Sequence, residues 1–273
     1  MLQFRVPSWV NKHQFEYENA DELSNSVVST IVFGMKKLNS NNSIASIVIP
    51  VWNEEKNIAR TLSSLAAQKT DYSFEVIVVN NNSTDGTQAV LDRCGVQSFF
   101  EPRQGIPWAR QAGLEKARGK YILCADGDSL YPENWVETLV QSLEQPDVAV
   151  VYGRHSFIPP KNSSRISIAI YEWFAEISFK IRGRKKLHLN AMAASLGFRR
   201  DWALEVGGFD PAMKRGSDGR LTFHLAQKGG ITVLHEDDAR VWTDSRRLFT
   251  NGGLVKAFVS RAWKEIKRFK EYV

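Results

Sequence analysis

Apolar and polar residues alternate in blocks along residues 44–130. Short runs rich in β-branched residues are typical of buried strands. Four such runs lie at Ala45–Val51, Phe74–Val79, Val96–Phe100 and Tyr121–Ala125. Between them, apolar residues recur every three or four positions, which predicts helices at Glu54–Gln68, from an N-cap at Ser83 through Leu91, and at Pro107–Arg118. Strands that alternate with helices predict an α/β fold with a mostly parallel central sheet flanked by helices.

The pattern of residues 131–250 is less regular. Strands are predicted at Val148–Gly153, Ala193–Phe198 and Ile231–His235, and helices at Ile166–Ile181 and Gly219–Lys228. We therefore divide the chain into an N-terminal extension (residues 1–43), a domain (44–250, with halves 44–130 and 131–250) and a C-terminal amphipathic helix (251–273). The extension ends in a polar, linker-like cluster at residues 39–43.

Polar clusters follow three of the predicted strands, at Pro50–Glu54, Asn80–Asp85 and Asp126–Ser129. In open α/β sheets, ligands bind at the carboxyl ends of the strands. Because the three clusters belong to separate segments that end at one edge of the sheet, we expect them to form a single site.

The triplet Asp126-Gly127-Asp128 offers two carboxylates around a residue that lets the backbone turn. Two such carboxylates after a buried strand can hold a hard divalent cation, Mg²⁺ or Mn²⁺. The cation would bridge the phosphates of a nucleotide diphosphate and stabilise the charge that develops on the leaving group.

These segments resemble glycosyltransferase family 2, the inverting enzymes with the GT-A, or nucleotide-diphospho-sugar transferase, fold. The matching pieces are Ser46–Glu55, Val78–Thr87, Gly105–Gly113, Ala125–Asp128 with Pro132, Gly207–Asp210 and Gly216–Asp218. The resemblance covers about residues 45–250. It implies that the first half of the domain binds the nucleotide, that the second half binds the acceptor, and that the protein acts in cell-envelope or polysaccharide biosynthesis.

For the donor, the resemblance places Pro50, Trp52 and Glu54 where the base and ribose are cradled. Asn81 stands where the family usually has a base-contacting aspartate, and an asparagine amide can both donate and accept hydrogen bonds. Arg110 lies where the family often contacts the donor.

For the chemistry, the resemblance gives the metal to Asp128, and the ribose or a metal-bound water to Asp126. Asp218 aligns with the general base that takes the proton of the attacking acceptor hydroxyl, although Ser217 replaces the usual glutamate before it. The predicted reaction moves a sugar, with inversion, from a nucleotide-diphosphate sugar to the hydroxyl of a glycan or of a lipid-linked acceptor.

A charged segment at residues 242–247 resembles a loop that closes over the donor phosphates. Arg246 and Arg247 could pair with the diphosphate, and Asp244 could add a metal ligand. A solvated charged loop explains the segment equally well. His235 has the ordinary interpretation of a core or surface residue, with a metal role left open.

The composition indicates which partners and which cellular compartment to expect. A net charge of +6 favours anionic partners. We expect a cytoplasmic protein, since there are two cysteines, no disulfide framework, and no stretch that resembles a signal peptide or a membrane span. Nucleic acid is not an expected partner, because no recognised nucleic-acid module occurs.

The apolar segment Ile166–Ile181 and the basic C-terminal helix leave three interpretations open: docking at the inner face of a membrane, packing on the domain, and a homodimer contact. Two other functions also stay open. A nucleotidyltransferase would usually have a glycine-rich phosphate loop, which residues 50–57 lack. A non-catalytic binding module is conceivable from the substitutions at residues 80–82 and 217, but Asp126, Asp128 and Asp218 argue against it.

Overall fold

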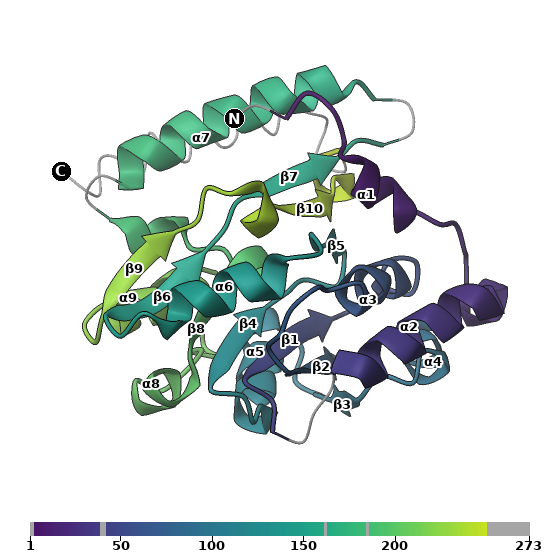
Figure 1. Ribbon diagram of the computed structural model, residues 1–273, viewed down its shortest axis with the longest axis horizontal. Helices are drawn as coiled ribbons and strands as arrows, with labels where there is room; N and C mark the ends of the chain where they lie inside the picture. The colour runs from purple at the N-terminus through teal and green to yellow at the C-terminus, as the bar shows by residue number, and fades with distance from the viewer. Residues whose placement is uncertain (1–2, 39–41, 161–162, 184–185, 214, 250–273) are drawn as a thin grey trace.

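The computed structural model describes residues 3–38, 42–160, 163–183, 186–213 and 215–249. Within this part of the chain, the strands form a seven-stranded sheet in the order β3-β2-β1-β4-β8-β6-β9 and a three-stranded sheet in the order β5-β10-β7 (Figure 1). The strands are β1 Ala45–Val51, β2 Phe74–Asn80, β3 Ser98–Phe100, β4 Tyr121–Cys124, β5 Ser129–Leu130, β6 Val148–Tyr152, β7 His155–Ile158, β8 Leu196–Arg199, β9 Gly230–Val233 and β10 Val241–Asp244.

The described helices flank these sheets (Figure 1). The α-helices are α1 Ser8–Lys12, α2 Asn25–Leu38, α3 Ile58–Ala66, α4 Thr87–Arg93, α5 Ile106–Lys116, α6 Trp135–Glu144, α7 Arg165–Gly183, α8 Arg200–Glu205, α9 Ser217–Leu225 and α10 Arg246–Phe249. The 3-10 helices are η1 Ala20–Glu22, η2 Leu187–Asn190, η3 Ala193–Ser195 and η4 Asp237–Ala239.

The main sheet is mostly parallel, as the sequence predicts. Strand β1 pairs in parallel with β2 and β4, β2 with β3, and β6 with β9. Strand β8 is antiparallel to both neighbours, β4 and β6. The strand predicted from Ala193 begins only at Leu196, because residues 193–195 form the turn η3.

Side chains of the central strands alternate between two hydrophobic cores. Ile47 and Ile49 of β1 face one core together with α3 and α6. Val48, between them, faces the other core together with α5 and α9. Successive side chains of a strand point to opposite faces, so a sheet covered on both sides needs the continuous apolar run that the sequence shows.

Two predicted helix starts are wrong by about one turn. Helix α3 begins at Ile58, because residues 54–57 form a turn closed by hydrogen bonds from the amides of Asn57 and Ile58 to the carbonyl oxygen of Glu54. Helix α4 begins at Thr87 after Gly86. Ser83 is not its N-cap: the Ser83 hydroxyl accepts a hydrogen bond from the Asn53 amide at 3.1 Å.

Residues 13–38 pack on the first half of the domain, whereas α1 lies beside β10 (Figure 1). Tyr17, Leu23 and Ile31 are buried in the same core as β1 and α3. The Tyr17 hydroxyl accepts a hydrogen bond from the Ala59 amide at 3.1 Å. The predicted C-terminal helix, residues 251–273, lies outside the described residues.

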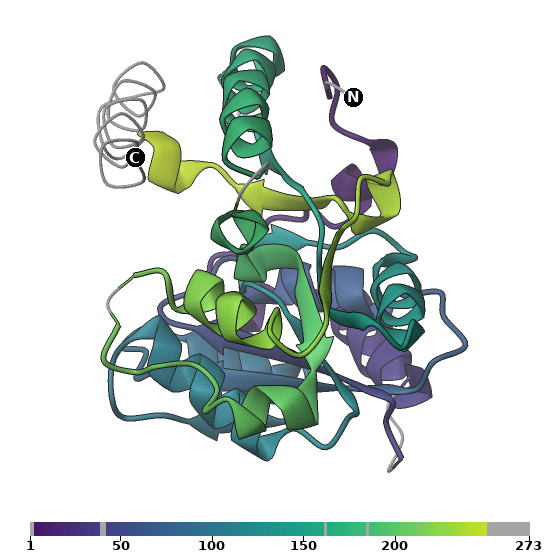
Figure 2. The same ribbon diagram turned by 90° about the vertical axis from the view of Figure 1, so that its left-hand side faces the viewer.

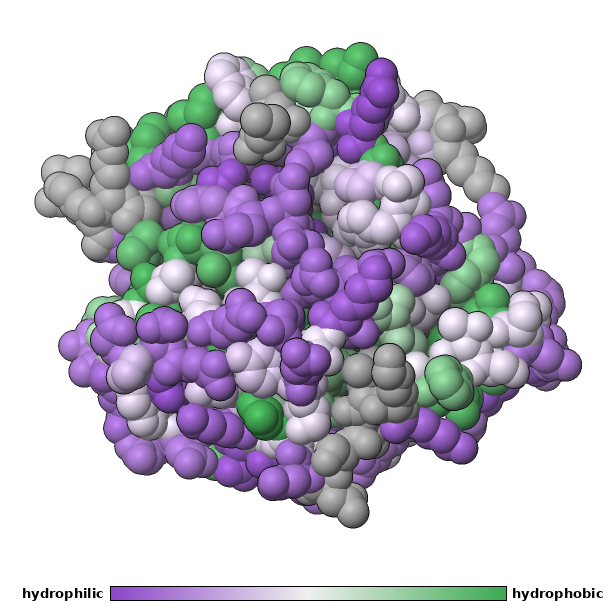
Figure 3. Space-filling model, in the orientation of Figure 1, coloured by the Kyte–Doolittle hydropathy of each residue, from purple (hydrophilic) through white to green (hydrophobic). Residues whose placement is uncertain are grey.

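Helix α7 lies on the far side of the small sheet from the main sheet (Figure 2). Its residues Ile168 and Tyr171 pack against Phe157 of β7. Apolar residues gather along the upper edge of the molecule, where α7 runs (Figure 3). No helix of the described residues is long and apolar enough to cross a membrane.

Candidate active site

The three polar strand ends meet at one edge of the main sheet, because β2, β1 and β4 are neighbours. The Asn81 amide donates to the carbonyl oxygen of Val51 at 2.8 Å. A Cβ added at Gly127 would lie 2.8 Å from a methyl carbon of Val51. The turn that carries Asp126 and Asp128 therefore lies against the end of β1, and this close approach requires glycine between the two aspartates.

Arg110 of α5 joins Asp218 to Asp126. Its guanidinium lies 2.5 Å from the Asp218 carboxylate and 3.1 Å from that of Asp126, and its side chain is 7% exposed. Burial disfavours the charged guanidinium, but the attraction of Asp218 and Asp126 is greater, so the pKa of Arg110 is raised. Asp218, which is 92 positions from Asp126 in the numbering, thus lies beside the Asp126–Asp128 turn.

Asp218 stands in the first turn of α9. Gly216 before it has φ +83°, a left-handed conformation that glycine adopts without strain. The second carboxylate oxygen of Asp218 accepts from the Ala193 amide at 3.4 Å, and the side chain is 22% exposed. The carboxylate is therefore held by α5 and η3 while part of it remains accessible.

Arg246 of α10 forms a second network with Glu54 and Asp128. Its guanidinium contacts both carboxylate oxygens of Glu54, one of them at 2.5 Å, and lies 3.4 Å from Asp128. Burial opposes the charge, yet the Glu54 and Asp128 carboxylates raise the pKa of Arg246. The segment predicted to close over the site is thus in contact with it. Nothing is described of the Arg247 side chain.

The two networks together hold four carboxylates and two guanidinium groups. This excess of negative charge suits a divalent cation, and the carboxylates of Asp126 and Asp128 are hard oxygen ligands. Among the described residues, no group of three or more His, Cys, Asp or Glu is arranged to hold a metal. Asp126 and Asp128 could therefore supply only part of the ligands of such a cation.

The side chain of Asn81 holds a loop in place, a role that the sequence does not predict. Its side-chain amide donates to the carbonyl oxygens of Glu101 at 3.2 Å and Arg103 at 2.7 Å, and its oxygen accepts from the Gly105 amide at 2.7 Å. These bonds fasten the loop between β3 and α5 to the end of β2. The other residues predicted to cradle the base differ in exposure: Trp52 is 53% exposed, and Pro50 is half-buried.

Tyr131 is a site residue that the sequence analysis missed. Its hydroxyl accepts from the Asp126 amide at 2.8 Å and donates to the Ala194 carbonyl at 3.2 Å. Burial raises the pKa of Tyr131 well above its ordinary value, so the hydroxyl stays protonated and can donate. The sequence feature that could have identified Tyr131 is its position, a few residues after the paired aspartates.

Asp244 lies next to the site through its backbone. Its amide donates to the Asp128 carbonyl at 2.9 Å, and its carboxylate accepts from the Arg246 amide at 2.6 Å. The Thr243 hydroxyl lies 3.4 Å from the Asp128 carboxylate. His235 is not part of either network. It lines a separate cavity of about 330 Å³ beneath α7, and burial lowers its pKa.

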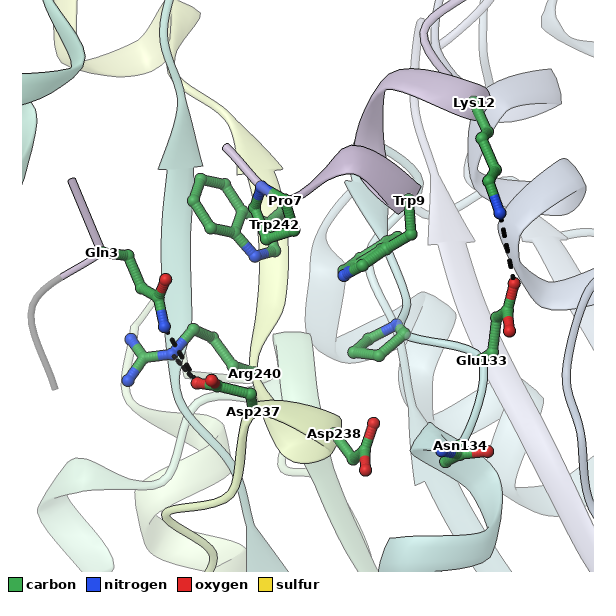
Figure 4. A pocket seen from close by; sticks show the side chains of 11 residues that line it. Gln3, Pro7, Trp9, Lys12, Glu133, Asn134, Asp237, Asp238, Arg240 and Trp242 are labelled. Carbon is green, nitrogen blue, oxygen red and sulfur yellow. Dashed lines mark hydrogen bonds and ion pairs between the residues drawn. The ribbon is translucent and has the colours of Figure 1, made fainter. Parts of the chain in front are cut away.

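Another cavity, of about 420 Å³, separates the N-terminal segment from η4 and the start of α6 (Figure 4). Trp9 and Trp242 line it, and Lys12 and Glu133 face each other across its edge (Figure 4). None of the residues predicted for the donor site lines this cavity.

The fold and the strand-end site define an α/β protein with a mostly parallel sheet and a cluster of charged residues at the ends of its central strands. Residues 46–207 match the family model described as glycosyl transferase family 2. The chain therefore belongs to glycosyltransferase family 2.

Relatives and solved structures fit this assignment. The glycosyltransferase AglE of Haloferax volcanii is 28% identical over 70% of this chain and 64% of its own length. The glucosyl-dolichyl phosphate glucuronosyltransferase of the same organism is 26% identical over 72% of this chain and 67% of its own length. The chain spans less than two thirds of the length of several relatives, including 64% of AglE and 29% of YfnE from Bacillus subtilis.

Solved structures share the fold. The mannosyltransferase PcManGT from Pyrobaculum calidifontis, in complex with GDP-Man and Mn²⁺, has a TM-score of 0.57 at 19% identity over 87% of this chain and 72% of that one. TarS residues 1–349 of S. aureus, in complex with UDP-GlcNAc, has a TM-score of 0.55 at 20% identity over 74% and 58%. The fold is of the GT-A type.

Proposed function

We propose that the protein is an inverting glycosyltransferase that moves a sugar from a nucleotide-diphosphate donor to an acceptor hydroxyl. The observation that carries the proposal is the contact of Arg110 with both Asp126 and Asp218. It brings the candidate base, from the second half of the domain, to the strand ends where the donor would bind. The proposed division of labour gives residues 44–130 to the nucleotide and residues 131–250 to the acceptor.

Asp218 accepts the proton of the acceptor hydroxyl as that oxygen attacks the anomeric carbon. Its contact with Arg110 holds the carboxylate beside the turn that carries Asp126. Asp126 and Asp128 would hold Mg²⁺ or Mn²⁺, which supplies electrostatic stabilisation of the departing diphosphate. Manganese in the PcManGT complex supports this choice of cofactor.

Donor binding uses the remaining strand-end residues. Pro50, Trp52 and the loop fastened by Asn81 would enclose the base and ribose. Arg246 would exchange part of its contact with Glu54 for the diphosphate, since a guanidinium pairs well with phosphate oxygens. GDP-Man and UDP-GlcNAc in the similar structures support a nucleotide-diphosphate sugar as donor. We propose a cytoplasmic location and a role in cell-envelope or polysaccharide biosynthesis, with a glycan or a lipid-linked molecule as acceptor.

The test begins with a screen of sugar nucleotides for release of nucleoside diphosphate, with and without Mn²⁺. On the donor found, Asp218→Asn should keep donor binding and lose transfer by roughly 100- to 10,000-fold. Asp128→Ala should lose the metal-dependent part of donor binding. Asp92→Asn, at an exposed position of α4, is the matched control and should behave like the wild type.

Three outcomes would contradict the proposal. Undiminished transfer by Asp218→Asn would refute its role as the base. Release of pyrophosphate from a nucleoside triphosphate would identify a nucleotidyltransferase. Calorimetric binding of a nucleotide sugar without turnover on any acceptor would indicate a binding module.

A further inference from the structure

The outer face of α7 is apolar and exposed. Its large hydrophobic side chains recur every three or four residues and are between 37% and 58% exposed: Ile166, Ile170, Trp173, Phe174, Ile177 and Ile181. The rings of Trp173 and Phe174 lie edge to face, with centroids 5.0 Å apart. Helix α7 runs along the upper edge of the molecule (Figure 1), where apolar surface is visible (Figure 3).

The acidic residues of α7 point away from this face. The sequence of the helix holds two of them, Glu172 and Glu176. Glu172 is paired with Arg165 at 2.6 Å and accepts from the Phe157 amide at 2.7 Å, and Glu176 is paired with Arg154. Both carboxylates are thus neutralised on the inner side of α7. The outer face presents six large apolar side chains.

Two basic segments of the sequence follow elements of this region. Residues 182–186 read Arg-Gly-Arg-Lys-Lys. Leu248 of α10 packs in one cluster with Ile168 and Tyr171 of α7, and residues 250–273 follow α10 in the sequence. That segment carries six basic and two acidic residues. An apolar face bordered by lysine and arginine is complementary to the surface of an anionic bilayer.

The cavity on the inner side of α7 is lined by a residue that adjoins the segment in contact with the candidate base. The cavity of about 330 Å³ lies between α7 and the sheets, and Tyr171, Phe179 and Met192 are among the residues that line it. The residue after Met192 is Ala193, whose amide bonds to Asp218. A molecule held under α7 would therefore extend towards the carboxylate that is proposed to activate the acceptor.

We propose that the outer face of α7 docks on the surface of an anionic membrane, and that the acceptor is a lipid-linked molecule that enters beneath α7. The second part rests on the proposed function, whereas the first does not. A second copy of the chain is a poorer occupant, because a symmetric contact through α7 would bring two basic runs together. An anionic membrane can bury the apolar stripe and attract the basic residues that border it.

The docking is tested with the full chain and sedimented vesicles of phosphatidylcholine, with and without phosphatidylserine. The wild type should bind the anionic vesicles, and salt should weaken the binding. The double variant Ile170→Ser, Trp173→Ser should bind at least about tenfold more weakly, because two side chains that would enter the interface lose their apolar surface. Phe33→Ser is the matched control: Phe33 is 73% exposed on α2, and its replacement should leave vesicle binding unchanged.

Two results would overturn the docking proposal. The first is equal vesicle binding by the double variant and the wild type. The second is light scattering that shows a homodimer for the wild type and a monomer for the double variant. Thermal unfolding of both variants shows whether they remain folded.

In a separate measurement, radiolabelled sugar should pass from the donor into the organic-solvent extract of vesicles made from cellular lipids. Labelling of water-soluble acceptors alone would refute the lipid-linked acceptor. Vesicle binding without any sugar transfer would refute the proposed function and leave the docking intact.

Discussion

At the scale of single residues, the candidate site is organised by polar side chains that each connect two segments. Arg110 connects the Asp126 turn to α9, and Arg246 connects α10 to Glu54. Asn81 connects the end of β2 to the loop that precedes α5. A buried group with several partners is costly to replace, since each lost partner leaves an unsatisfied polar atom. These residues therefore set the shape of the site as well as its charge.

The variant Asn81→Asp tests whether the hydrogen bonds of one such residue stabilise the fold. The family often has aspartate there, yet in this chain the carboxylate would face the carbonyl oxygens of Glu101 and Arg103 and could donate to neither. We expect the variant to be less stable by roughly 2–4 kcal/mol in urea unfolding. Asn82→Asp, at the exposed neighbouring position with φ +59°, should change stability by less than about 0.5 kcal/mol. Equal stability of the two variants would contradict the role of the Asn81 amide.

At the scale of elements, the sequence pattern and the structure agree best where a segment is buried on both faces. Strands β1, β2 and β4 are continuous apolar runs, and they end where predicted to within a residue. Strands β5, β7 and β10 were not predicted, and Trp242–Asp244, predicted as part of a loop, belong to β10. β5 has two residues, and both β5 and β7 join a sheet through β10, from far along the chain. Their local sequence carries no periodicity that could reveal such a pairing.

Gly34→Ala tests the packing of α2 on α3. Alanine usually stabilises a helix by about 1 kcal/mol relative to glycine. Here a Cβ at Gly34 would lie 2.4 Å from the carbonyl oxygen of Ala66, so the helices would have to separate. We expect a loss of roughly 1–3 kcal/mol in unfolding free energy. Ser29→Ala, at an exposed position of the same helix, should be neutral or slightly stabilising. A stabilising effect of Gly34→Ala would show that the two helices are not in close contact.

At the scale of the whole molecule, the N-terminal residues and the domain share one core. His13 joins them, because its ring lies 2.9 Å from the Ser63 hydroxyl of α3. Burial lowers the pKa of His13 from 6.5 to about 4, with Glu133 acting against this shift and Lys12 adding to it. The folded protein therefore holds the ring neutral, while the unfolded chain can bind a proton.

This predicts a pH-dependent stability. Because the pKa of His13 is lower in the folded state, protons favour unfolding, and stability falls as the pH decreases from about 6.5 to about 4. We expect His13 to account for about 2 kcal/mol of the loss between about pH 7 and about pH 5 in urea unfolding. His13→Gln should flatten the curve over this range. A slope in the variant equal to that of the wild type would refute the role of His13.

The sequence by itself determined the α/β class, the parallel strands and the grouping of the three polar strand ends. Each of these follows from local periodicity and from a rule that holds for every parallel sheet. Only the tertiary structure decided which charged groups meet. Arg110 contacts Asp218, which is 108 positions away in the sequence. Arg246 contacts Glu54, which is 192 positions away. Packing brings such partners together, and no local pattern records it. The same holds for α7: its apolar stripe is visible in the sequence, but only the fold shows which face lies outward.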